Sequence, residues 1–327
     1  MNPFSSFIQH LRYHASLGII SLIRYLPYSL ALYLFQFLSI LGWIVDPFHR
    51  KIGEIQMRSA LGLAHPRPYV LKVFMNLAVI LVDTVKYAYL SDSEIQKRIM
   101  VDGKEYLDEA LASGKGMMMV TGHIGNWEIL SHIPRILGIQ FCVMADLRKD
   151  EKLESIVDTI RSRSGASILP PTGKALMLIK ELRKGRTIGM VVDNRGEQKD
   201  ALFCSVFGMP APTNPAPAFI AIKGEAIVLP VYAVKLDGVY HIRFLKAVDA
   251  SQFGRGQEAI QVLSDYLQSF IVSVVEKYPD QWFWLYSRWV KRSTFKRTIR
   301  NEKDFRTYVL SQAEQSRGVS WKGTKEA

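Results

Sequence analysis

Short apolar runs alternate with amphipathic segments from about residue 100 to residue 277, and this pattern constrains the fold more than any other feature. Strands are expected at 101–103, 117–120, 139–145, 167–169, 187–192, 227–234 and 240–244. Helices are expected at 104–112, 126–137, 152–162, 174–184 and 257–277. Strands and helices that alternate at these lengths predict an α/β fold, with a mostly parallel central sheet flanked by helices.

The stretch from Gly116 to Glu128 predicts a strand, a tight turn and a helix, with His123 in the turn. In one continuous helix, His123 and Glu128 would lie roughly 140° apart and could not meet. Gly125, followed by the capping residue Asn126, supplies the break that lets them approach each other. Glu128 then falls in the first turn of the helix.

A histidine oriented by an acid at the end of a strand suits general-base catalysis. The acid fixes the tautomer of the imidazole and stabilises the imidazolium formed when a hydroxyl is deprotonated. The alternative is that Glu128 only complements the helix dipole and that His123 is an ordinary loop residue. Asp193 follows the predicted strand 187–192, so it also lies at a strand end, where ligands bind in parallel sheets.

Two further segments carry candidate site residues. Arg161 and Arg163 stand at a predicted helix end and could bind a phosphate or an acyl carbonyl oxygen, although cations are also favoured there without a ligand. The Pro/Gly-rich segment 207–213 is expected to be a loop that ends at Thr213 and presents a helix N-terminus to an anionic or carbonyl group. A simple helix cap is the alternative.

An uncharged run of 21 residues, Tyr25 to Val45, is long enough to cross a hydrocarbon core of roughly 30 Å. It predicts membrane attachment; spanning the bilayer and lying in its interface both remain open, and a buried core helix is the alternative. Charges interrupt the second apolar segment, 69–90, which is expected to pack on the catalytic domain. The predicted domains are a membrane-associated helical segment (1–60), an α/β catalytic domain (61–300) and a poorly ordered polar tail (301–327).

The net charge of +12 implies an acidic partner, such as nucleic acid, anionic lipid or an acidic protein. Aromatic residues at 281–289 precede basic residues spaced four apart, which would form one face if that segment were helical: Arg288, Arg292, Lys296 and Arg300. With an apolar N-terminus in the same chain, lipid is the preferred partner. Cys142 and Cys204 lack metal-site spacing, which argues against zinc and against a disulfide framework.

Several motifs together resemble a known family. His123 to Glu128 resembles the H-x4-[DE] motif of glycerolipid and lysophospholipid acyltransferases. More narrowly, the chain resembles bacterial lipid A late acyltransferases of the lauroyl/myristoyl type and relatives that acylate phosphatidylinositol mannosides. The resemblance covers nearly the whole chain and rests on the order of its motifs: the apolar N-terminus, His123 to Glu128, Arg161-x-Arg163, Asp193, the segment ending at Thr213, and Pro279 to Trp289. The chain departs from the family pattern at Arg195 and Tyr286, where many members have Asp and His.

The resemblance implies a glycerolipid-acyltransferase-like fold and transfer of a fatty acyl chain from acyl carrier protein or acyl-coenzyme A. The implied acceptor is a hydroxyl of a membrane glycolipid, such as a lipid A precursor, at the cytoplasmic face of the bacterial inner membrane. His123 would be the base and Glu128 would orient it. Arg161 or Arg163 would stabilise the oxyanion, and Asp193, Asn126 and Thr213 complete the expected substrate-binding set. No cofactor, metal or nucleic acid is expected.

Three alternatives follow from the same features. The acceptor could be another phospholipid or a phosphatidylinositol mannoside. The basic C-terminal residues would also suit a non-catalytic, membrane-docked protein that binds anionic lipid. A thioesterase or lipid hydrolase is less favoured, because the sequence contains no Gly-x-Ser-x-Gly motif.

Overall fold

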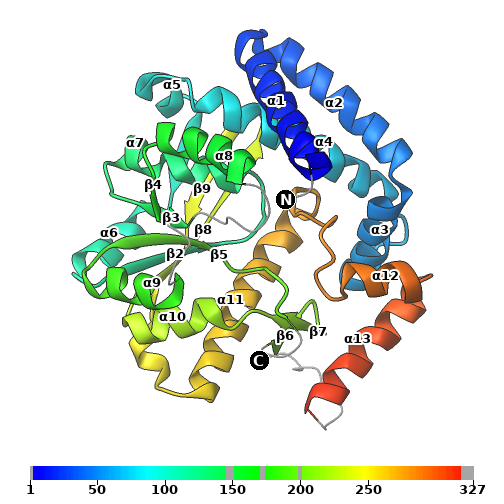
Figure 1. The fold of residues 1–327 in the computed structure, drawn as a ribbon. Coiled ribbons are helices and arrows are strands. Elements are labelled where there is room, and N and C mark those ends of the chain that lie inside the picture. The colour runs from blue at the N-terminus through cyan, green and yellow to red at the C-terminus, as the bar shows by residue number, and fades with distance from the viewer. Residues whose placement is uncertain (1–2, 145–150, 170–173, 198–200, 318–327) are drawn as a thin grey trace.

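The structure, a computed structural model, describes residues 3–144, 151–169, 174–197 and 201–317 (Figure 1). Its central sheet has the strand order β1-β9-β8-β2-β5-β3-β4, with β10 paired to β8. These strands are β1 Ile99–Asp102, β2 Met117–Thr121, β3 Cys142–Met144, β4 Ser167–Leu169, β5 Thr187–Val191, β8 Ile227–Leu236, β9 Val239–Phe244 and β10 Val248–Asp249. Only the pairs β8–β9 and β8–β10 are antiparallel. The predicted α/β fold is confirmed; Ala145, expected to end a strand, lies outside the described residues.

Helices cover both faces of the sheet, which explains why β2 is buried along its whole length. Met117 and Met119 pack on one face with α5 Asp92–Gln96, α6 Lys104–Ala112 and α7 Ile133–Leu137. Met118 and Val120 pack on the other face with α9 Lys174–Arg183, α10 Ala216–Gly224 and α11 Gln257–Lys277. The centre of the sheet is therefore shielded from water on both sides.

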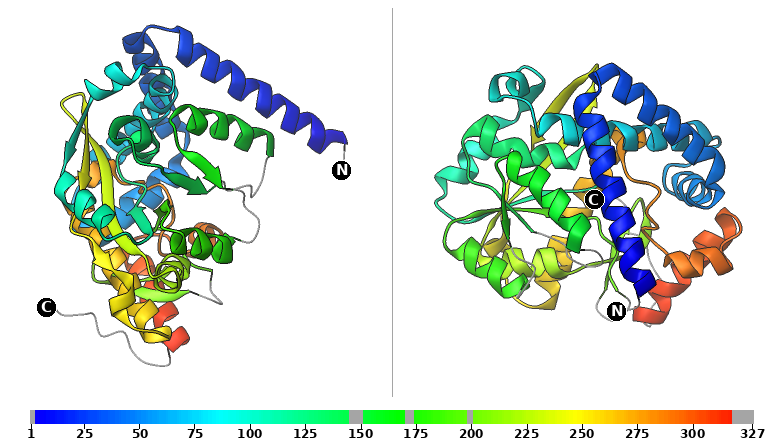
Figure 2. Two further views of the ribbon diagram at one scale, coloured as in Figure 1. Left: turned by 90° about the vertical axis from the view of Figure 1, so that its left-hand side faces the viewer. Right: turned by 45° about the horizontal axis from the view of Figure 1, so that its top comes forward.

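Four long helices precede α5 and the first strand: α1 Pro3–Tyr25, α2 Tyr28–Val45, α3 Pro47–Leu61 and α4 Arg67–Tyr87. The start of α1 extends away from the rest of the molecule (Figure 2). Both α2 and α4 are long and apolar enough to cross a membrane. Of the apolar stretch in each helix, 11% is buried inside the protein in α2 and 39% in α4. α4 packs against α2 and α3, and it also contacts residues 127–132 and 279–281 of the α/β part, as expected for segment 69–90.

α8 Glu151–Arg163 packs the N-terminal helices against the α/β part of the chain. Its Ile156 and Ile160 belong to an apolar cluster that also contains Ile23 of α1, Phe35 of α2 and Val82 of α4. α8 carries Arg161 close to this cluster. α1, α2 and α4 therefore pack against the helix that carries Arg161.

Three local expectations were wrong. Residues 127–132 form a 3-10 helix, η1 Trp127–His132, before α7, where one helix over 126–137 was expected. The segment 207–213 is mainly a strand, since β6 Leu202–Val206 and β7 Met209–Thr213 form a hairpin that turns at Phe207 and Gly208, both with positive φ. The tail expected to be poorly ordered contains α13 Glu302–Arg317, whose Phe305 and Val309 are buried in the core.

The expected basic stripe is also wrong. α12 spans only Arg292–Thr298, and Arg288 precedes it in a non-helical segment with 1% of its surface exposed. Its guanidinium donates to the carbonyl of Pro212 and to Thr213 Oγ1, both at 2.6 Å. Arg288 therefore supports the end of β7 from inside the protein. The short 3-10 helices η2 Ala250–Phe253 and η3 Pro279–Gln281 complete the described elements.

Candidate active site

His123 and Asp193 meet at the carboxyl edge of the sheet. β2 and β5 are parallel neighbours, so the residues that follow them emerge side by side. His123 Nδ1 lies 2.8 Å from Asp193 Oδ1, and the backbone N–H of His123 donates to Asp193 Oδ2, also at 2.8 Å. An ionised carboxylate can only accept, so Nδ1 carries the proton and Nε2 is left with a lone pair in the neutral ring.

Two glycines allow this close approach. A Cβ at Gly122 would stand 3.0 Å from Asp193 Oδ2 and 2.7 Å from Ile271 Cδ1. Gly125 has φ +56°, and a Cβ there would meet the carbonyl oxygen of Ala233 at 1.9 Å. The turn around His123 therefore needs glycine for space at one position and for both space and conformation at the other.

The segment after η3 holds the His123 turn from the far end of the chain. Gly125 N–H donates to the Gln281 carbonyl at 2.7 Å, and Phe283 N–H donates to the His123 carbonyl at 3.0 Å. Between them, Trp282 Nε1 donates to Asp193 Oδ2 at 2.7 Å. From the sequence, these aromatic residues were expected to face lipid, and the hydrogen bond of Trp282 to Asp193 was missed. The signal in the sequence was the density of tryptophans near the C-terminus.

The His123–Asp193 pair shifts the acidity of both groups. Burial acts to lower the pKa of His123, but the charge and hydrogen bond of Asp193 outweigh it, with a smaller contribution from the charge of Glu128, so the pKa is raised above 6.5. Burial acts to raise the pKa of Asp193, but His123 and Trp282 outweigh it, so that pKa is lowered. Asp193 is therefore ionised and favours the imidazolium form of His123.

Glu128 has a different partner from the one expected. Its carboxylate accepts two hydrogen bonds from Arg161, 3.0 Å from Nε and 2.7 Å from Nη2. About a fifth of each side chain is exposed, 21% for Arg161 and 17% for Glu128. The side chain that holds the His123 ring is therefore Asp193, which corrects the expectation that Glu128 orients it. Glu128 instead fixes the guanidinium of Arg161 in a bidentate pair.

The other expected site residues are not all in the site. Arg163 is exposed, and its guanidinium lies over the ring of Tyr89 at 4.6 Å. Asn126 is buried; its Oδ1 caps the N–H of Glu128 at 3.2 Å and its Nδ2 donates to Tyr240 at 3.3 Å. Thr213 is also buried and bonds to Arg288. In this structure, both Asn126 and Thr213 support neighbouring residues.

A cavity of about 540 Å³, which we call the His123 cavity, lies against these groups. Its polar side carries His123, Glu128, Arg161, Asn194, Asn214 and Tyr286. Its apolar lining comes from the sheet and the flanking helices and includes Met119, Leu130, Phe141, Leu178, Ile220 and Val231. The N-terminus of α10 reaches the cavity at Ala216. The cavity therefore places His123 and Arg161 next to an apolar compartment.

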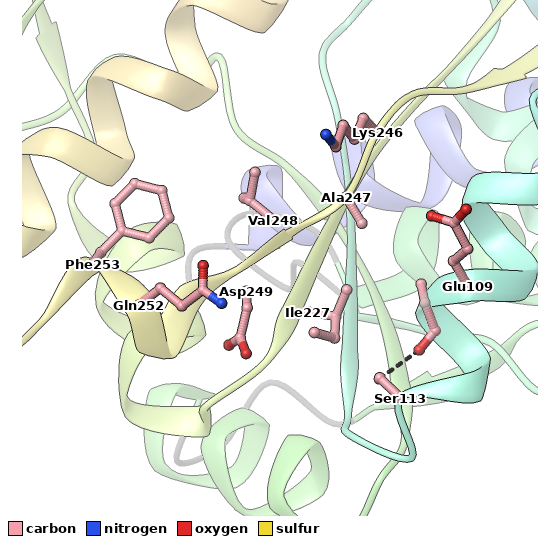
Figure 3. A pocket seen from close by; sticks show the side chains of 10 residues that line it. Glu109, Ser113, Ile227, Lys246, Ala247, Val248, Asp249, Gln252 and Phe253 are labelled. Carbon is pink, nitrogen blue, oxygen red and sulfur yellow. Dashed lines mark hydrogen bonds between the residues drawn. The ribbon is translucent and has the colours of Figure 1, made fainter.

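Another cavity, of about 610 Å³, lies at the opposite edge of the sheet, where β8 begins (Figure 3). Glu109, Lys246, Asp249 and Phe253 line it, and it includes none of the candidate site residues. It lies beside the amino end of β8, away from the carboxyl edge where His123 and Asp193 meet. Within the described part of the chain, no three His, Cys, Asp or Glu residues are grouped so that they could hold a metal ion.

Comparison with known proteins places this site in context. A family model described as "Bacterial lipid A biosynthesis acyltransferase" matches residues 1–291. The lipid A biosynthesis palmitoleoyltransferase of Escherichia coli K12 is 23% identical over 304 residues, which cover 88% of this chain and 95% of that protein. A phosphatidylinositol mannoside acyltransferase of Mycobacterium tuberculosis (strain CDC 1551 / Oshkosh) is 24% identical over 195 residues, 58% of this chain and 60% of that protein.

Among solved structures, the 1-acyl-sn-glycerophosphate acyltransferase PlsC of Thermotoga maritima aligns with 78% of this chain and 99% of that chain. The identity is 15% and the TM-score is 0.38. At this score, the superposition supports no conclusion about this chain.

Proposed function

Because this chain belongs to the bacterial lipid A biosynthesis acyltransferase family, and is therefore an acyltransferase that acts on lipid, we propose that His123 is its general base. We propose further that it moves a fatty acyl chain from an acyl thioester to a hydroxyl of a membrane glycolipid. The observation that carries the proposal is the His123–Asp193 pair at the edge of a cavity with an apolar lining.

The proposed chemistry needs one base and one oxyanion stabiliser. His123 Nε2 takes the proton of the acceptor hydroxyl while Asp193 stabilises the imidazolium that forms. The acceptor oxygen attacks the thioester carbonyl, the new C–O bond forms and the C–S bond breaks. The leaving thiolate receives the proton from His123, so the products are an ester and a thiol. Arg161, held by Glu128, offers positive charge to the oxyanion of the tetrahedral intermediate.

The apolar lining of the His123 cavity suits the donor's hydrocarbon chain, since burying each methylene contributes about 0.8 kcal/mol. The net charge of +12 favours an acidic donor, and acyl carrier protein is the donor we propose, with acyl-coenzyme A as the other outcome of the test. The acceptors named for the relatives are lipid A and phosphatidylinositol mannosides. We propose a lipid A precursor first.

Exposed apolar side chains on the N-terminal helices support a membrane-attached protein. They include Leu17 and Leu22 of α1 and Tyr33, Phe37, Leu38, Leu41 and Ile44 of α2. Apolar side chains exposed in this number on two neighbouring helices fit a lipid bilayer. We place the catalytic part at the cytoplasmic face of the bacterial inner membrane, where acyl thioesters are made.

The test is acyl transfer by the purified full-length protein in mixed vesicles. Labelled acyl carrier protein or acyl-coenzyme A is supplied with either a lipid A precursor or a phosphatidylinositol mannoside, and the products are identified by mass spectrometry. His123→Ala should lower transfer about 10²–10⁴-fold while leaving the circular dichroism spectrum unchanged. Near-normal activity in this variant would rule out the base assignment. Free fatty acid as the sole product would favour a hydrolase.

A further inference from the structure

A second space reaches His123 from the side of the N-terminal helices. A crevice of about 10 Å³ is lined by His123, Trp127, Asn76, Ile80, Asp280, Gln281 and residues next to them. A volume of this size holds about one water molecule, so it admits a single hydroxyl group and little more. His123 and Trp127 line both this crevice and the His123 cavity. His123 therefore borders two spaces.

The crevice adjoins a larger space of about 420 Å³, which we call the α2–β8 cavity. The two share Asn76, Ile80, Asp280 and Gln281. The rest of the lining comes from α2, α4, the His123 turn and the β8–β9 hairpin: Tyr28, Leu32, Val79, Gly125, Asn126, Lys235, Gly238 and Tyr240. α2 also carries the exposed apolar side chains described above, so a lipid whose tails contact that helix could place its headgroup here.

The charges around the α2–β8 cavity disfavour an anionic ligand. Lys235 Nζ lies 2.6 Å from Asp83 Oδ2, and Asp83 is fully buried, so the ammonium is already neutralised. The carboxylate of Asp280 makes no hydrogen bond or ion pair with any of the residues the structure describes. No arginine occurs among the described residues that line the space. Amide, phenol and carboxylate groups of this kind bind hydroxyl groups, and the carboxylate of Asp280 in the lining would repel a phosphate placed beside it, although the charge of Arg98 also reaches Tyr28.

We propose that the α2–β8 cavity binds an uncharged sugar ring of the glycolipid acceptor, whose hydroxyl arm extends through the crevice to His123. This inference rests on the proposed function. The acyl donor occupies the His123 cavity and the acceptor comes from the α2–β8 cavity, so the two substrates do not compete for one entrance. Asp280 lines both the larger space and the crevice, and it accepts a hydrogen bond from the sugar at their junction.

The test fills the α2–β8 cavity without touching the base. Val79→Trp places an indole in the space, whereas the control Leu81→Trp changes an exposed residue of the same helix that lines neither space. Val79→Trp should raise the KM for the glycolipid about tenfold or more, with the KM for the acyl thioester unchanged. Asp280→Ala should change the KM in the same direction, which protects the test against a folding defect in the tryptophan variant.

Direct binding separates this inference from the proposed function. Saturation-transfer NMR should detect methyl α-glucopyranoside on the wild-type protein and on Leu81→Trp, but not on Val79→Trp. Sugar binding that persists in Val79→Trp, or no sugar binding to the wild type, overturns the inference even if acyl transfer is intact. Competition by inorganic phosphate that Val79→Trp abolishes overturns the assignment to an uncharged ligand. Sugar binding without any acyl transfer contradicts only the proposed function.

Discussion

Two carboxylates influence the His123 ring, and each has a different hydrogen-bond partner. Asp193 bonds directly to Nδ1, whereas Glu128 is paired with Arg161. The roles of the two acids therefore differ: Asp193 controls the tautomer and basicity of His123, and Glu128 controls the position of a cation. This division leads to opposite expectations for the two amide variants.

Asp193→Asn should lower kcat/KM about 10²–10⁴-fold. The base must be neutral to accept a proton, so the acid limb of the pH–rate profile follows the pKa of His123. Because Asp193 is the main cause that raises this pKa above 6.5, the limb should move to lower pH in the variant. Measuring kcat/KM between pH 5 and pH 9 checks the shift. The Trp282 hydrogen bond can be kept by the asparagine oxygen, which limits structural damage.

Glu128→Gln is the matched control for this prediction. The charge of Glu128 is the weakest of the causes that raise the pKa of His123. Its removal should therefore move the acid limb less than Asp193→Asn does. Its main effect should be on kcat through a less well-positioned Arg161. A larger shift of the acid limb in Glu128→Gln than in Asp193→Asn would restore the idea that Glu128 orients the base.

Sequence reasoning placed His123 and Asp193 at strand ends but paired His123 with the wrong acid. The strand pattern predicts where each strand stops, yet it does not say which strands are neighbours. Asp193 meets His123 only because β2 and β5 are adjacent, and Trp282 joins them from 89 residues further along the chain. Glu128 was preferred as the partner of His123 because the two residues are near in sequence. The side chain that Glu128 binds is Arg161, which is 33 residues away.

At the level of elements, β5 determines how deep the His123 cavity is. Gly189 faces the ring of Phe141, and a Cβ at Gly189 would stand 2.3 Å from Phe141 Cζ. Both residues line the cavity, and Gly189 pairs with Met119 and Val143 in the sheet. Because Gly189 has no side chain, the Phe141 ring packs directly on the backbone of β5 and closes part of the apolar compartment.

Gly189→Ala should force the Phe141 ring into the cavity and shift the preferred donor toward shorter acyl chains. Phe141→Ala should enlarge the cavity and favour longer chains. Comparing kcat/KM for a series of acyl thioesters of increasing length measures both changes. Phe203→Ala removes a buried phenylalanine from β6, outside the cavity lining, and should leave the preference unchanged. Identical chain-length profiles for all three variants would place the acyl chain elsewhere.

Secondary structure was predictable for the sheet and less so for segments whose form depends on distant contacts. The runs at β2, β5 and β8 are apolar on both faces, so their pattern alone identifies them. β7 contains two prolines and belongs to a two-stranded sheet with β6, which made it resemble a loop. α13 is polar along most of its length. It packs against α3 and β7, and the ring of its buried Phe305 lies against Trp289 and Phe295.

On the scale of the whole molecule, the exposed apolar surface of α2 should set the affinity for membranes. Phe37 and Leu41 are 57% and 40% exposed and lie one turn apart on this helix. Replacing both with Glu should reduce binding to anionic vesicles at least about a hundredfold, since each side chain contributes about 1.5 kcal/mol or more when buried. Vesicle co-sedimentation measures the change.

Leu176→Glu is the control for membrane binding. Leu176 is 78% exposed on α9, far from the N-terminal helices in the sequence, so its replacement should leave vesicle binding unchanged. Equal losses in both proteins would mean that added negative charge, and not lost apolar contact, weakens binding. Undiminished binding of the α2 variant would show that the bilayer contacts another surface.

The hydrogen bonds from residues 281–283 to the His123 turn and to Asp193 form late during synthesis. α2 leaves the ribosome more than two hundred residues before Trp282 does. At about 5–20 residues per second, roughly ten seconds to most of a minute pass between the two events. During that time the nascent chain can already reach the bilayer, while Asp193 still lacks its indole donor and the His123 turn lacks its two backbone partners. In the proposed function, the chain would thus reach the membrane before the His123 site is complete.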